Sequence, residues 1–319
     1  GKGKDTNIKT FDNLFNLWFE SYENTVKPNT AETKKIRYER VVKPLIGNAN
    51  IKKITPALAQ QIVNKLAAKY KSYRQYLVIL NSPLNYAVKL SMLDVNVFKL
   101  VIFPKATDKK KYKHIESDNN FYSKDELITF LENVKGYNFK YYTFFRLLAY
   151  SGMRSGECLA LQWKDIDFKN NTINIDKTME RIKVDSKYQW LIDTPKRPKS
   201  IRVIPLANRA KEQLLWLKTV SPGLEASGDD HIFVTENNIP PSQSTLTRTL
   251  KAILKRADIE SDGFGLHDLR HSFGSMLLQK GWEQNQPVDI KVISEILGHE
   301  DVSTTYNIYM HIMNKHKSE

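Results

Sequence analysis

A lysine-rich stretch without periodicity divides this chain into two parts. Residues 104–122 read PKATDKKKYKHIESDNNFY, with few aliphatic side chains and a run of three lysines. Such a segment offers no apolar face to a core, which is typical of a linker. At 319 residues the chain is long enough for two domains. The sequence therefore predicts a domain at 1–103 and a second at 123–319.

The positive charge of the chain is concentrated in its first third. Residues 1–114 hold 22 of the 49 Lys and Arg but only 8 of the 35 Asp and Glu, so they carry the whole excess of 14 positive charges. A basic domain attracts polyanions, because phosphate binding releases condensed counterions. A lysine-rich solvated surface is the alternative, but the asymmetry between the two parts favours nucleic acid. We expect the first domain to bind DNA or RNA.

Four helices are expected in the first domain. Thr10, Asn29 and Thr55 are the expected N-caps of the first three. The fourth runs over about 72–90, with a kink expected at Pro83. Basic residues near the junction of the last two helices, and in the linker, are candidates for contacts with a phosphate backbone: Lys65, Lys69, Lys71, Arg74, Lys109, Lys110 and Lys111. For the linker lysines a plain tether is an equal alternative.

The second domain is predicted to be mixed, with helices and one small antiparallel sheet. Ser123 and Glu126 form a capping box at the start of its first helix. Strand-like periods occur in TINID at 172–176, WLIDT at 190–194 and SIRVIPL at 200–206. Helical patterns occupy about 123–134, 138–151, the stretch after Gly152, 207–219, 243–257, 267–280, 288–297 and 302–312. The expected fold class is mainly α with a small antiparallel β-sheet.

The remaining composition narrows the class of protein. A hydrophobic fraction of 41% excludes a disordered chain. The single cysteine, Cys158, excludes an internal disulfide and fits a reducing cytosol. No apolar run approaches the roughly 20 residues of a membrane span. The chain begins with GKGK rather than Met, so we expect a native N-terminal segment to precede it.

The C-terminal string LGHEDVSTTYNIYMHI offers a nucleophile for phosphate. Tyr306 and Tyr309 are three residues apart, so both can lie on one side of a helix. A tyrosine becomes a nucleophile only where a base and cations favour the phenolate, because its unperturbed pKa is about 10. His299 follows a glycine that would end the preceding helix, which presents the imidazole from a turn. By itself, a tyrosine on an apolar face is more often part of a core.

Two upstream motifs supply charged groups that suit phosphate. Arg154, in GMRSGECLALQW, lies at an expected helix start, where its guanidinium can hold a phosphate with two hydrogen bonds. Glu157 is placed three residues on to orient that arginine. In HDLRH, His267 and Arg270 share a helical face, and His271 is expected to be a structural hydrogen-bonding residue.

A zinc site on HDLRH is the competing interpretation. His267 and His271 have the four-residue spacing of a zinc-binding helix. The general-base glutamate of that motif is absent, and Arg270 on the same face would repel a cation. Only Cys158 is available as a thiolate ligand. We therefore expect no metal and no cofactor.

Taken in order, these motifs resemble the tyrosine recombinase family, in particular the integrases of phages and conjugative transposons. The matching strings are GMRSGECLALQWKDIDF, TPKRPKSIRVIPL, GLHDLRHSFGSMLL and ILGHEDVSTTYNIYMHI. The resemblance covers nearly all of residues 120–312. The basic first third is similar to the family's helical core-binding domain more loosely, through its position and helical pattern. The stretch WEQNQP departs from the family, because it is longer than the usual short turn there.

The resemblance implies the groups that bind the phosphate and move the nucleophile's proton. Arg154 and Arg270 match the two arginines that hold the scissile phosphate. His267 matches the residue that shuttles the proton of the nucleophile, and His299 matches a donor to the phosphate. Glu157 matches a supporting acidic position.

The resemblance also implies the nucleophile and the acid for the leaving group. Tyr309 occupies the nucleophile's place in TTxxIYxH, and Tyr306 lies too early, so it is expected to pack in the core. Lys196 matches the lysine that protonates the departing 5′ oxygen, with Lys199 close by.

The activity implied is site-specific recombination through a 3′-phosphotyrosyl link, which integrates or excises a mobile element. The implied partners are double-stranded DNA, three further copies of the chain in a homotetramer, and accessory DNA-bending or directionality factors, in the bacterial cytoplasm at the nucleoid. A type IB topoisomerase, which relaxes DNA as a monomer, and a non-catalytic DNA-binding regulator on the same scaffold are the alternatives. The LGH…TTxxIYxH spacing favours a recombinase over a topoisomerase, and a regulator would lack catalytic positions that this chain keeps.

Overall fold

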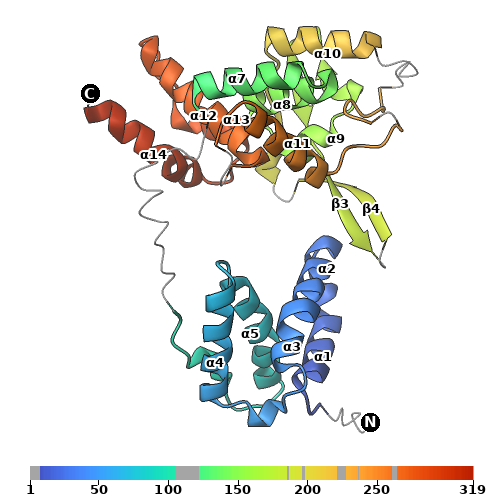
Figure 1. Ribbon diagram of the computed structural model, residues 1–319, viewed down its shortest axis with the longest axis vertical. Helices are drawn as coiled ribbons and strands as arrows, with labels where there is room; N and C mark the ends of the chain where they lie inside the picture. Colours follow the sequence, from blue (N-terminus) through green and yellow to red (C-terminus); the bar gives the residue numbers. More distant parts are fainter. Residues whose placement is uncertain are drawn as a thin grey trace. The chain divides into compact units, whose positions relative to one another are not determined.

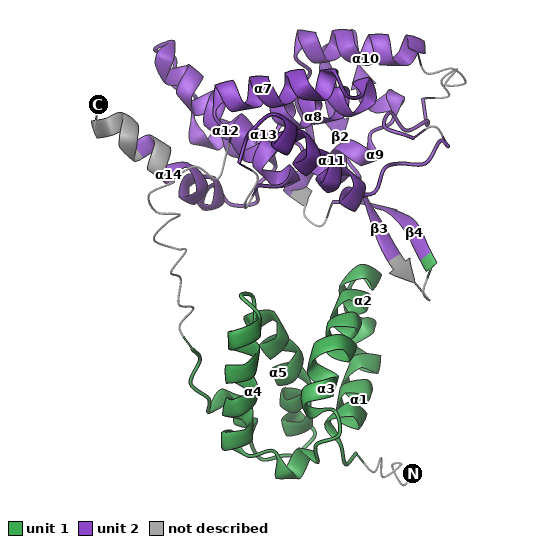
Figure 2. Ribbon diagram, viewed as in Figure 1, with its two compact units in different colours: residues 1–110, 183–187 green, residues 111–182, 188–319 purple. Residues whose placement is uncertain are grey.

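The computed structural model describes residues 8–104, 122–184, 187–195, 198–220, 228–235, 237–260 and 264–318. The chain forms two compact units, residues 1–110 with 183–187, and residues 111–182 with 188–319 (Figure 2). Each unit is described by itself. Residues 105–121, the main part of the expected linker, lie outside the described residues. In the part that is described, no helix is long and apolar enough to cross a membrane.

The first unit is built from helices (Figure 1). Its core is rich in aromatic side chains. Phe15 of the first helix and Tyr38 stack with ring centroids 3.5 Å apart, and the Tyr38 hydroxyl donates to Asp12 over 2.6 Å. Its elements are α1 (Phe11–Glu23), α2 (Pro28–Arg37), a π-helical turn (Tyr38–Val42), α3 (Lys43–Ile46), α4 (Pro56–Lys69) and α5 (Arg74–Lys89), with short 3₁₀ turns at Ile51–Lys53 and Val97–Lys99.

Two of the three N-caps expected in this unit are confirmed. The hydroxyls of Thr10 and Thr55 accept hydrogen bonds from backbone N–H groups in the first turns of α1 and α4. The expectation for Asn29 is wrong, because α2 already begins at Pro28, where a fixed φ and a missing N–H suit a first turn. Pro83 lies inside α5, which continues through it to residue 89.

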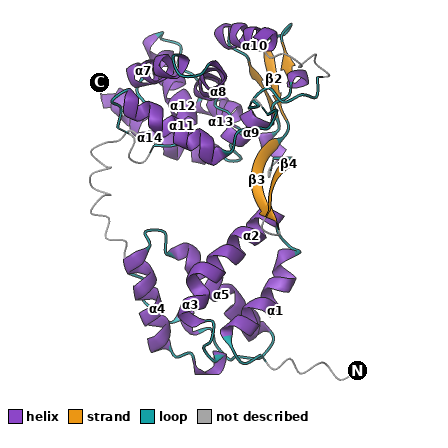
Figure 3. Cartoon of the chain, turned by 45° about the vertical axis from the view of Figure 1, so that its right-hand side comes forward, coloured by secondary structure: helices purple, strands orange, loops and turns teal. Residues whose placement is uncertain are grey.

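The second unit is mainly helical, which confirms the expected fold class (Figure 3). Its helices are α7 (Lys124–Lys135), α8 (Phe139–Ser151), α9 (Ser155–Ala160), α10 (Asn208–Val220), α11 (Gln243–Arg256), α12 (Leu266–Glu283), α13 (Ile290–Leu297) and α14 (Val302–Ser318). The strands are β1 (Ile166–Asp167), β2 (Thr172–Ile175), β3 (Thr178–Val184), β4 (Lys187–Asp193) and β5 (Arg202–Pro205). The capping box of Ser123 and Glu126 opens α7 as expected.

The strands form two small sheets rather than the one expected. The first is antiparallel in the order β1-β2-β5, with Ile173 opposite Ile204 at its centre. The second pairs β3 with β4. The sequence pattern missed β3, because its buried residues Met179 and Ile182 are three positions apart and give no period of two.

The core of the second unit surrounds α8, which is buried along most of its length. α7, α10 and α12 all pack against it (Figure 1). α13 and α14 pack on α12 and on each other, and their apolar residues form a smaller cluster of their own. The end of α8, the start of α9, the first turns of α12 and the α13–α14 turn therefore come close together. Three of the motifs singled out in the sequence contribute residues at these points: GMRSGECLALQW, HDLRH and LGHEDVSTTYNIYMHI.

Candidate active site

Arg154 is held at the start of α9 by Glu157. The backbone N–H of Arg154 donates to Glu157 Oε2 over 2.9 Å, and its Nη1 donates to Oε1 over 2.7 Å. Its Nη2 reaches the carbonyl oxygen of Gly298 at 3.2 Å, which ties α9 to the α13–α14 turn. The Arg154 side chain stays 38% exposed, so one side of the guanidinium remains open to a ligand.

Glu157 is a buried carboxylate between two arginines. Arg202 of β5 donates from Nη2 to Glu157 Oε2 over 2.9 Å and from Nη1 to Oε1 over 3.3 Å. Burial would raise the pKa of Glu157, but the charges and hydrogen bonds of Arg202 and then Arg154 outweigh it and lower that pKa. The carboxylate is therefore ionised at neutral pH and lies against the Arg154 guanidinium.

Arg270 is buried with part of its hydrogen-bonding capacity unused. Its side chain on α12 is 1% exposed, and Nη1 donates to the carbonyl oxygen of Gly152 over 2.8 Å. Nε and Nη2 find no acceptor among the described residues. Burial and then the charge of Arg154 lower the pKa of Arg270 to about 9, which leaves it protonated at neutral pH. A buried guanidinium with free donors is suited to an anion.

The two histidines of α12 lie next to each other. Their rings pack edge to face, with the centroids of His267 and His271 4.7 Å apart. Desolvation and then Arg270 lower the pKa of His267, and desolvation and then His267 lower the pKa of His271 to about 4. Both rings are therefore neutral at pH 7, so His267 can accept a proton. The hydrogen bond expected of His271 is not found at its buried Nδ1, which has no partner among the described residues.

His299 is presented from the turn between α13 and α14. Gly298 ends α13 in the left-handed conformation, at φ 66°, as its place after a helix suggests. His299 Nδ1 lies 2.7 Å from the hydroxyl of Thr305, which is fully buried. Desolvation and then the charges of Arg270 and Arg154 lower the pKa of His299 to about 3, so this imidazole is also neutral.

The two tyrosines of α14 differ in their surroundings. Tyr309 is 0% exposed, whereas Tyr306 is 43% exposed, so the expectation that Tyr306 packs in the core is wrong. Of the two rings, Tyr309 is the one that packs against α12. Burial raises the pKa of Tyr309 to about 12, and the charge of Arg270 opposes that rise.

The Tyr309 ring packs directly against the backbone of α12 at Gly274. A Cβ at position 274 would lie 2.1 Å from the Tyr309 hydroxyl oxygen, a distance that no side chain tolerates. The hydroxyl has no hydrogen-bond partner among the described residues. Gly274, the second glycine in GLHDLRHSFGSMLL, is therefore needed to make room for the Tyr309 ring. The sequence pattern did not suggest this role.

The remaining expected site residues are only partly described. Lys196 and the linker residues Lys109, Lys110 and Lys111 lie outside the described residues. Lys199 is exposed, and its Nζ donates to the backbone oxygen of Glu300 over 2.9 Å. The basic residues at the end of α4 and the start of α5 are all exposed, as a role in binding DNA requires: Lys65, Lys69, Lys71 and Arg74.

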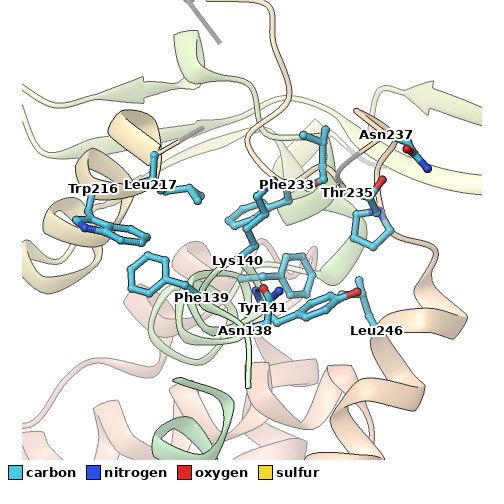
Figure 4. Close-up of a pocket in the computed structure, with 14 residues that line it drawn as sticks. Asn138, Phe139, Lys140, Tyr141, Trp216, Leu217, Phe233, Thr235, Asn237 and Leu246 are labelled. Atoms are coloured by element: carbon cyan, nitrogen blue, oxygen red, sulfur yellow. Dashed lines mark hydrogen bonds between the residues drawn. The ribbon is translucent and has the colours of Figure 1, made fainter. Parts of the chain in front are cut away.

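The second unit also has an apolar pocket of about 410 Å³ away from these residues (Figure 4). Phe139 and Trp216 face each other at one end of it, with ring centroids 3.9 Å apart. None of the residues that line it belongs to the group around Arg270. Among the described residues there is also no group of three or more His, Cys, Asp or Glu arranged to hold a metal ion.

Five expected residues are therefore brought together from α9, α12, the α13–α14 turn and α14. The group combines two guanidinium ions, two neutral imidazoles and a phenol: Arg154, Arg270, His267, His299 and Tyr309. Positive donors of this kind stabilise the charge of a phosphate, and neutral imidazoles exchange protons near it. The arrangement is chemically suited to attack of the phenol on a phosphodiester.

Comparison with known proteins points in the same direction. Residues 120–316 match the family described as "Phage integrase family", and residues 10–67 match "Phage integrase, N-terminal SAM-like domain". A protein named tyrosine recombinase XerC-like, of Caldanaerobacter subterraneus subsp. tengcongensis, is 29% identical over all of this chain and 83% of its own length. The ICEBs1 integrase of Bacillus subtilis (strain 168) is 27% identical over 97% of this chain and 81% of its own.

The fold is also similar to solved structures. The Tn1549 transposon integrase in complex with transposon right end DNA is 20% identical, with a TM-score of 0.74 over 94% of each chain. A lambda integrase tetramer bound to a Holliday junction is 14% identical, with a TM-score of 0.68 over 95% of this chain and 78% of that one. These likenesses confirm the expected two-domain architecture.

Proposed function

Because the chain belongs to the phage integrase family of tyrosine recombinases, we propose that its α12–α14 site cleaves and rejoins DNA through Tyr309. Members of this family are DNA strand-exchange enzymes that carry out site-specific recombination, and the chain is one of them. The observation that carries the assignment is Arg270, a buried cation whose Nε and Nη2 have no acceptor among the described residues. A scissile phosphate would supply those acceptors beside the only buried tyrosine of α14.

The two arginines have complementary parts in binding the phosphate. Arg270 offers two unused donors from a rigid helix, and Arg154 offers the open side of a guanidinium that Glu157 holds in place. Two-pronged hydrogen bonds to the non-bridging oxygens neutralise the charge that builds up as the phosphorus is attacked. Lysine at either position would keep the charge but lose this geometry.

The reaction is an exchange of one phosphodiester for another. The Tyr309 oxygen forms a bond to phosphorus, the bond from phosphorus to the 5′ oxygen breaks, and His267 takes the phenol proton. Its lowered pKa leaves His267 neutral and able to act as this base. Where the Thr305 hydroxyl donates to His299 Nδ1, the opposite ring nitrogen carries the proton and can donate it to a phosphate oxygen.

The assignments of the acid for the leaving group and of the DNA contacts come from the sequence. We assign protonation of the departing 5′ oxygen to Lys196, through the match of TPKRPKSIRVIPL to the family. We propose that the first unit holds the DNA through the exposed Lys65, Lys69, Lys71 and Arg74, and we assign contacts with the DNA backbone to Lys109, Lys110 and Lys111 from the sequence alone. The domain boundaries we propose are 1–103, 104–122 and 123–319.

The relatives support a proposal for the assembly and for its place of action. The solved lambda integrase is a tetramer on a Holliday junction, and we propose a homotetramer on double-stranded DNA for this chain. The substrate is the end or attachment site of a mobile element, because the relatives include integrases of a transposon and of ICEBs1. Accessory DNA-bending or directionality factors would assist it, and the site of action is the bacterial nucleoid.

Replacing Tyr309 by Phe tests the assignment. We expect Tyr309→Phe to bind an element-end oligonucleotide as the parent does, but to form no covalent protein–DNA complex on a nicked suicide substrate. Tyr306→Phe is the matched control, because it removes the same hydroxyl from an exposed ring three residues away and should leave complex formation intact. A covalent complex formed by Tyr309→Phe, or lost in Tyr306→Phe, would refute the choice of nucleophile.

A further inference from the structure

Arg202 on β5 is an almost fully paired arginine that the phosphate chemistry does not use. Its side chain is 7% exposed. Besides its two hydrogen bonds to Glu157, Nε donates to the backbone oxygen of Ile296 over 2.6 Å and Nη1 donates to that of Ser200 over 2.9 Å. One guanidinium thus binds α9, the end of α13 and the turn before its own strand.

The partners of Arg202 are also the supports of two proposed active-site residues. Glu157 holds both the backbone and the guanidinium of Arg154. The end of α13 carries Gly298, whose carbonyl oxygen accepts from Arg154, and then His299. Arg202 therefore contacts the support of Arg154 and the support of His299 at the same time.

The approach of the α13–α14 turn to Arg202 is close. A Cβ at Gly298 would lie 2.9 Å from Arg202 Nη1 and 3.2 Å from its Cδ. Gly298 therefore meets two requirements, a left-handed backbone and room for this guanidinium. The turn that presents His299 rests directly on the Arg202 side chain.

An arginine is the side chain that this position requires. Its planar fork matches the two oxygens of Glu157 and leaves Nε free for a third partner at a fixed angle. Lysine would keep the ion pair but reach only one or two of the acceptors. Strand geometry sends the side chain inward, because Arg202 shares the inward face of β5 with the buried Ile204.

We propose that Arg202 is a positioning residue for DNA cleavage, which holds Glu157 and the α13–α14 turn in register so that Arg154 and His299 face one phosphate. The proposal rests on the function proposed above for Arg154 and His299. Arg202 touches no reacting atom in this scheme and acts only through its neighbours. Its loss should therefore slow cleavage and leave binding of DNA intact.

The experiment compares Arg202→Gln and Arg202→Lys with the parent, with Arg154→Lys, and with Arg209→Gln. Arg209 on α10 is exposed and serves as the matched control for loss of an arginine on the same unit. Each protein is measured for thermal unfolding, for affinity to an element-end oligonucleotide, and for the single-turnover rate of covalent complex formation. The rate is measured on a normal suicide substrate and on one with a methylphosphonate at the scissile position.

The neutral methylphosphonate separates positioning from general damage, since it lacks a charge that the arginines must neutralise. On the normal substrate we expect Arg202→Gln to slow complex formation by about 10–100-fold, the range for groups that support functional side chains, with affinity unchanged. Arg202→Lys should be slowed less, and Arg209→Gln not at all. On the methylphosphonate substrate, Arg202→Gln and Arg154→Lys should slow complex formation by smaller factors than on the normal substrate, and the two factors should fall together.

The proposal is overturned if Arg202→Gln cleaves at the parental rate, or if its deficit is the same on both substrates. It is also overturned if both Arg202 variants fail to fold or to bind DNA, because the residue is then a structural support only. Failure of the proposed function looks different. In that case the parent forms no covalent complex, or Tyr309→Phe still forms one, whatever Arg202 does.

Discussion

The two halves of the candidate site satisfy their polar groups to different degrees. On the α9–β5 side, Arg154, Glu157 and Arg202 form a cluster in which both carboxylate oxygens and both guanidinium groups have partners. On the α12–α14 side, four buried polar atoms have no partner among the described residues: Arg270 Nε and Nη2, His271 Nδ1 and Tyr309 Oη.

This difference separates the groups that support the site from the groups that would contact the substrate. Buried polar atoms are nearly always hydrogen-bonded, so a cluster of exceptions needs a reason. The satisfied side positions its groups before DNA arrives. The unsatisfied side keeps two arginine donors and a phenol that a phosphate could pair. We therefore expect substitutions on the first side to reduce stability as well as slow cleavage, and substitutions of the unpaired groups on the second side to slow cleavage with little loss of stability.

The largest effect is expected at Arg270. Arg270→Met should lower the rate of covalent complex formation by at least about 10³-fold, as loss of a charge-stabilising arginine does in phosphoryl transfer. Its free energy of unfolding should stay within about 1 kcal/mol of the parent or rise, because a buried charge with unused donors is removed. Suicide-substrate kinetics and urea unfolding give the two values. Unfolding of the variant under conditions where Arg209→Met is stable would contradict the contrast between the halves.

At Glu157 we expect a large loss of stability. Glu157→Ala leaves the buried Arg202 without its carboxylate, so we expect a loss of about 3–5 kcal/mol in the free energy of unfolding, the cost of breaking a buried pair. Urea unfolding measures it, and Glu132→Ala on the exposed side of α7 is the control. A loss below that of a surface substitution would show that the cluster is not the scaffold of the site.

Substitution of Gly274 tests how tightly the Tyr309 ring packs against α12. Gly274→Ala places a Cβ against the Tyr309 hydroxyl, so we expect a stability loss of about 1–3 kcal/mol from overpacking and a displaced tyrosine ring. Gly136→Ala is the control, because the nearest atom to its Cβ is 3.8 Å away. Calorimetric unfolding and tyrosine fluorescence follow the two changes. Equal Tm values for the two variants would mean that the ring moves aside freely.

The most gradual effect is expected from pH. Folding lowers the pKa of His271 to about 4 and of His299 to about 3. Below pH 6.5 these imidazoles therefore bind protons more strongly in the unfolded chain than in the folded one, which destabilises the folded state. Each ring should then reduce stability by up to about 1.4 kcal/mol per pH unit as the pH falls from 6.5 towards 4. The lowered pKa of Glu157 adds a loss that begins only below about 4.5.

Urea unfolding at a series of pH values between neutrality and the acid limit measures this slope. His299→Gln should make it shallower, whereas Tyr306→Phe, which removes no imidazole, should not. The same slope in the parent and in His299→Gln would show that the His299 imidazole has the same pKa in the folded and the unfolded chain.

Sequence patterns predicted best the features that depend on interactions between near neighbours in the chain. The caps at Thr10, Thr55 and Ser123 were predictable, because a side-chain oxygen meets an N–H only three residues away. Asn29 failed because the stronger local preference of Pro28 for a first turn moved the start of the helix. The strand β3 failed because it lies in a two-stranded sheet with few buried residues.

The candidate site shows the same division. Motif order and spacing pointed to Arg154, His267, Arg270, His299 and Tyr309, and the structure brings these five together, although their roles stay predictions. Spacing alone did not separate the surroundings of Tyr306 and Tyr309, because a helix places residues three apart near one another and only packing decides which is covered. An arginine beside Ile204 on the inward face of a strand was the one available sign of Arg202.

The sequence by itself determined the chemical groups, the two-part division of charge and the helices that carry the motifs, since these depend on residue type and near neighbours. The tertiary structure alone decided the partners. Arg154 meets Gly298 across 144 residues, and Arg202 meets Glu157 across 45. Contacts of that kind exist only after α9, β5, α12 and α13 have packed, because their geometry is set by the burial of apolar faces far apart in the chain.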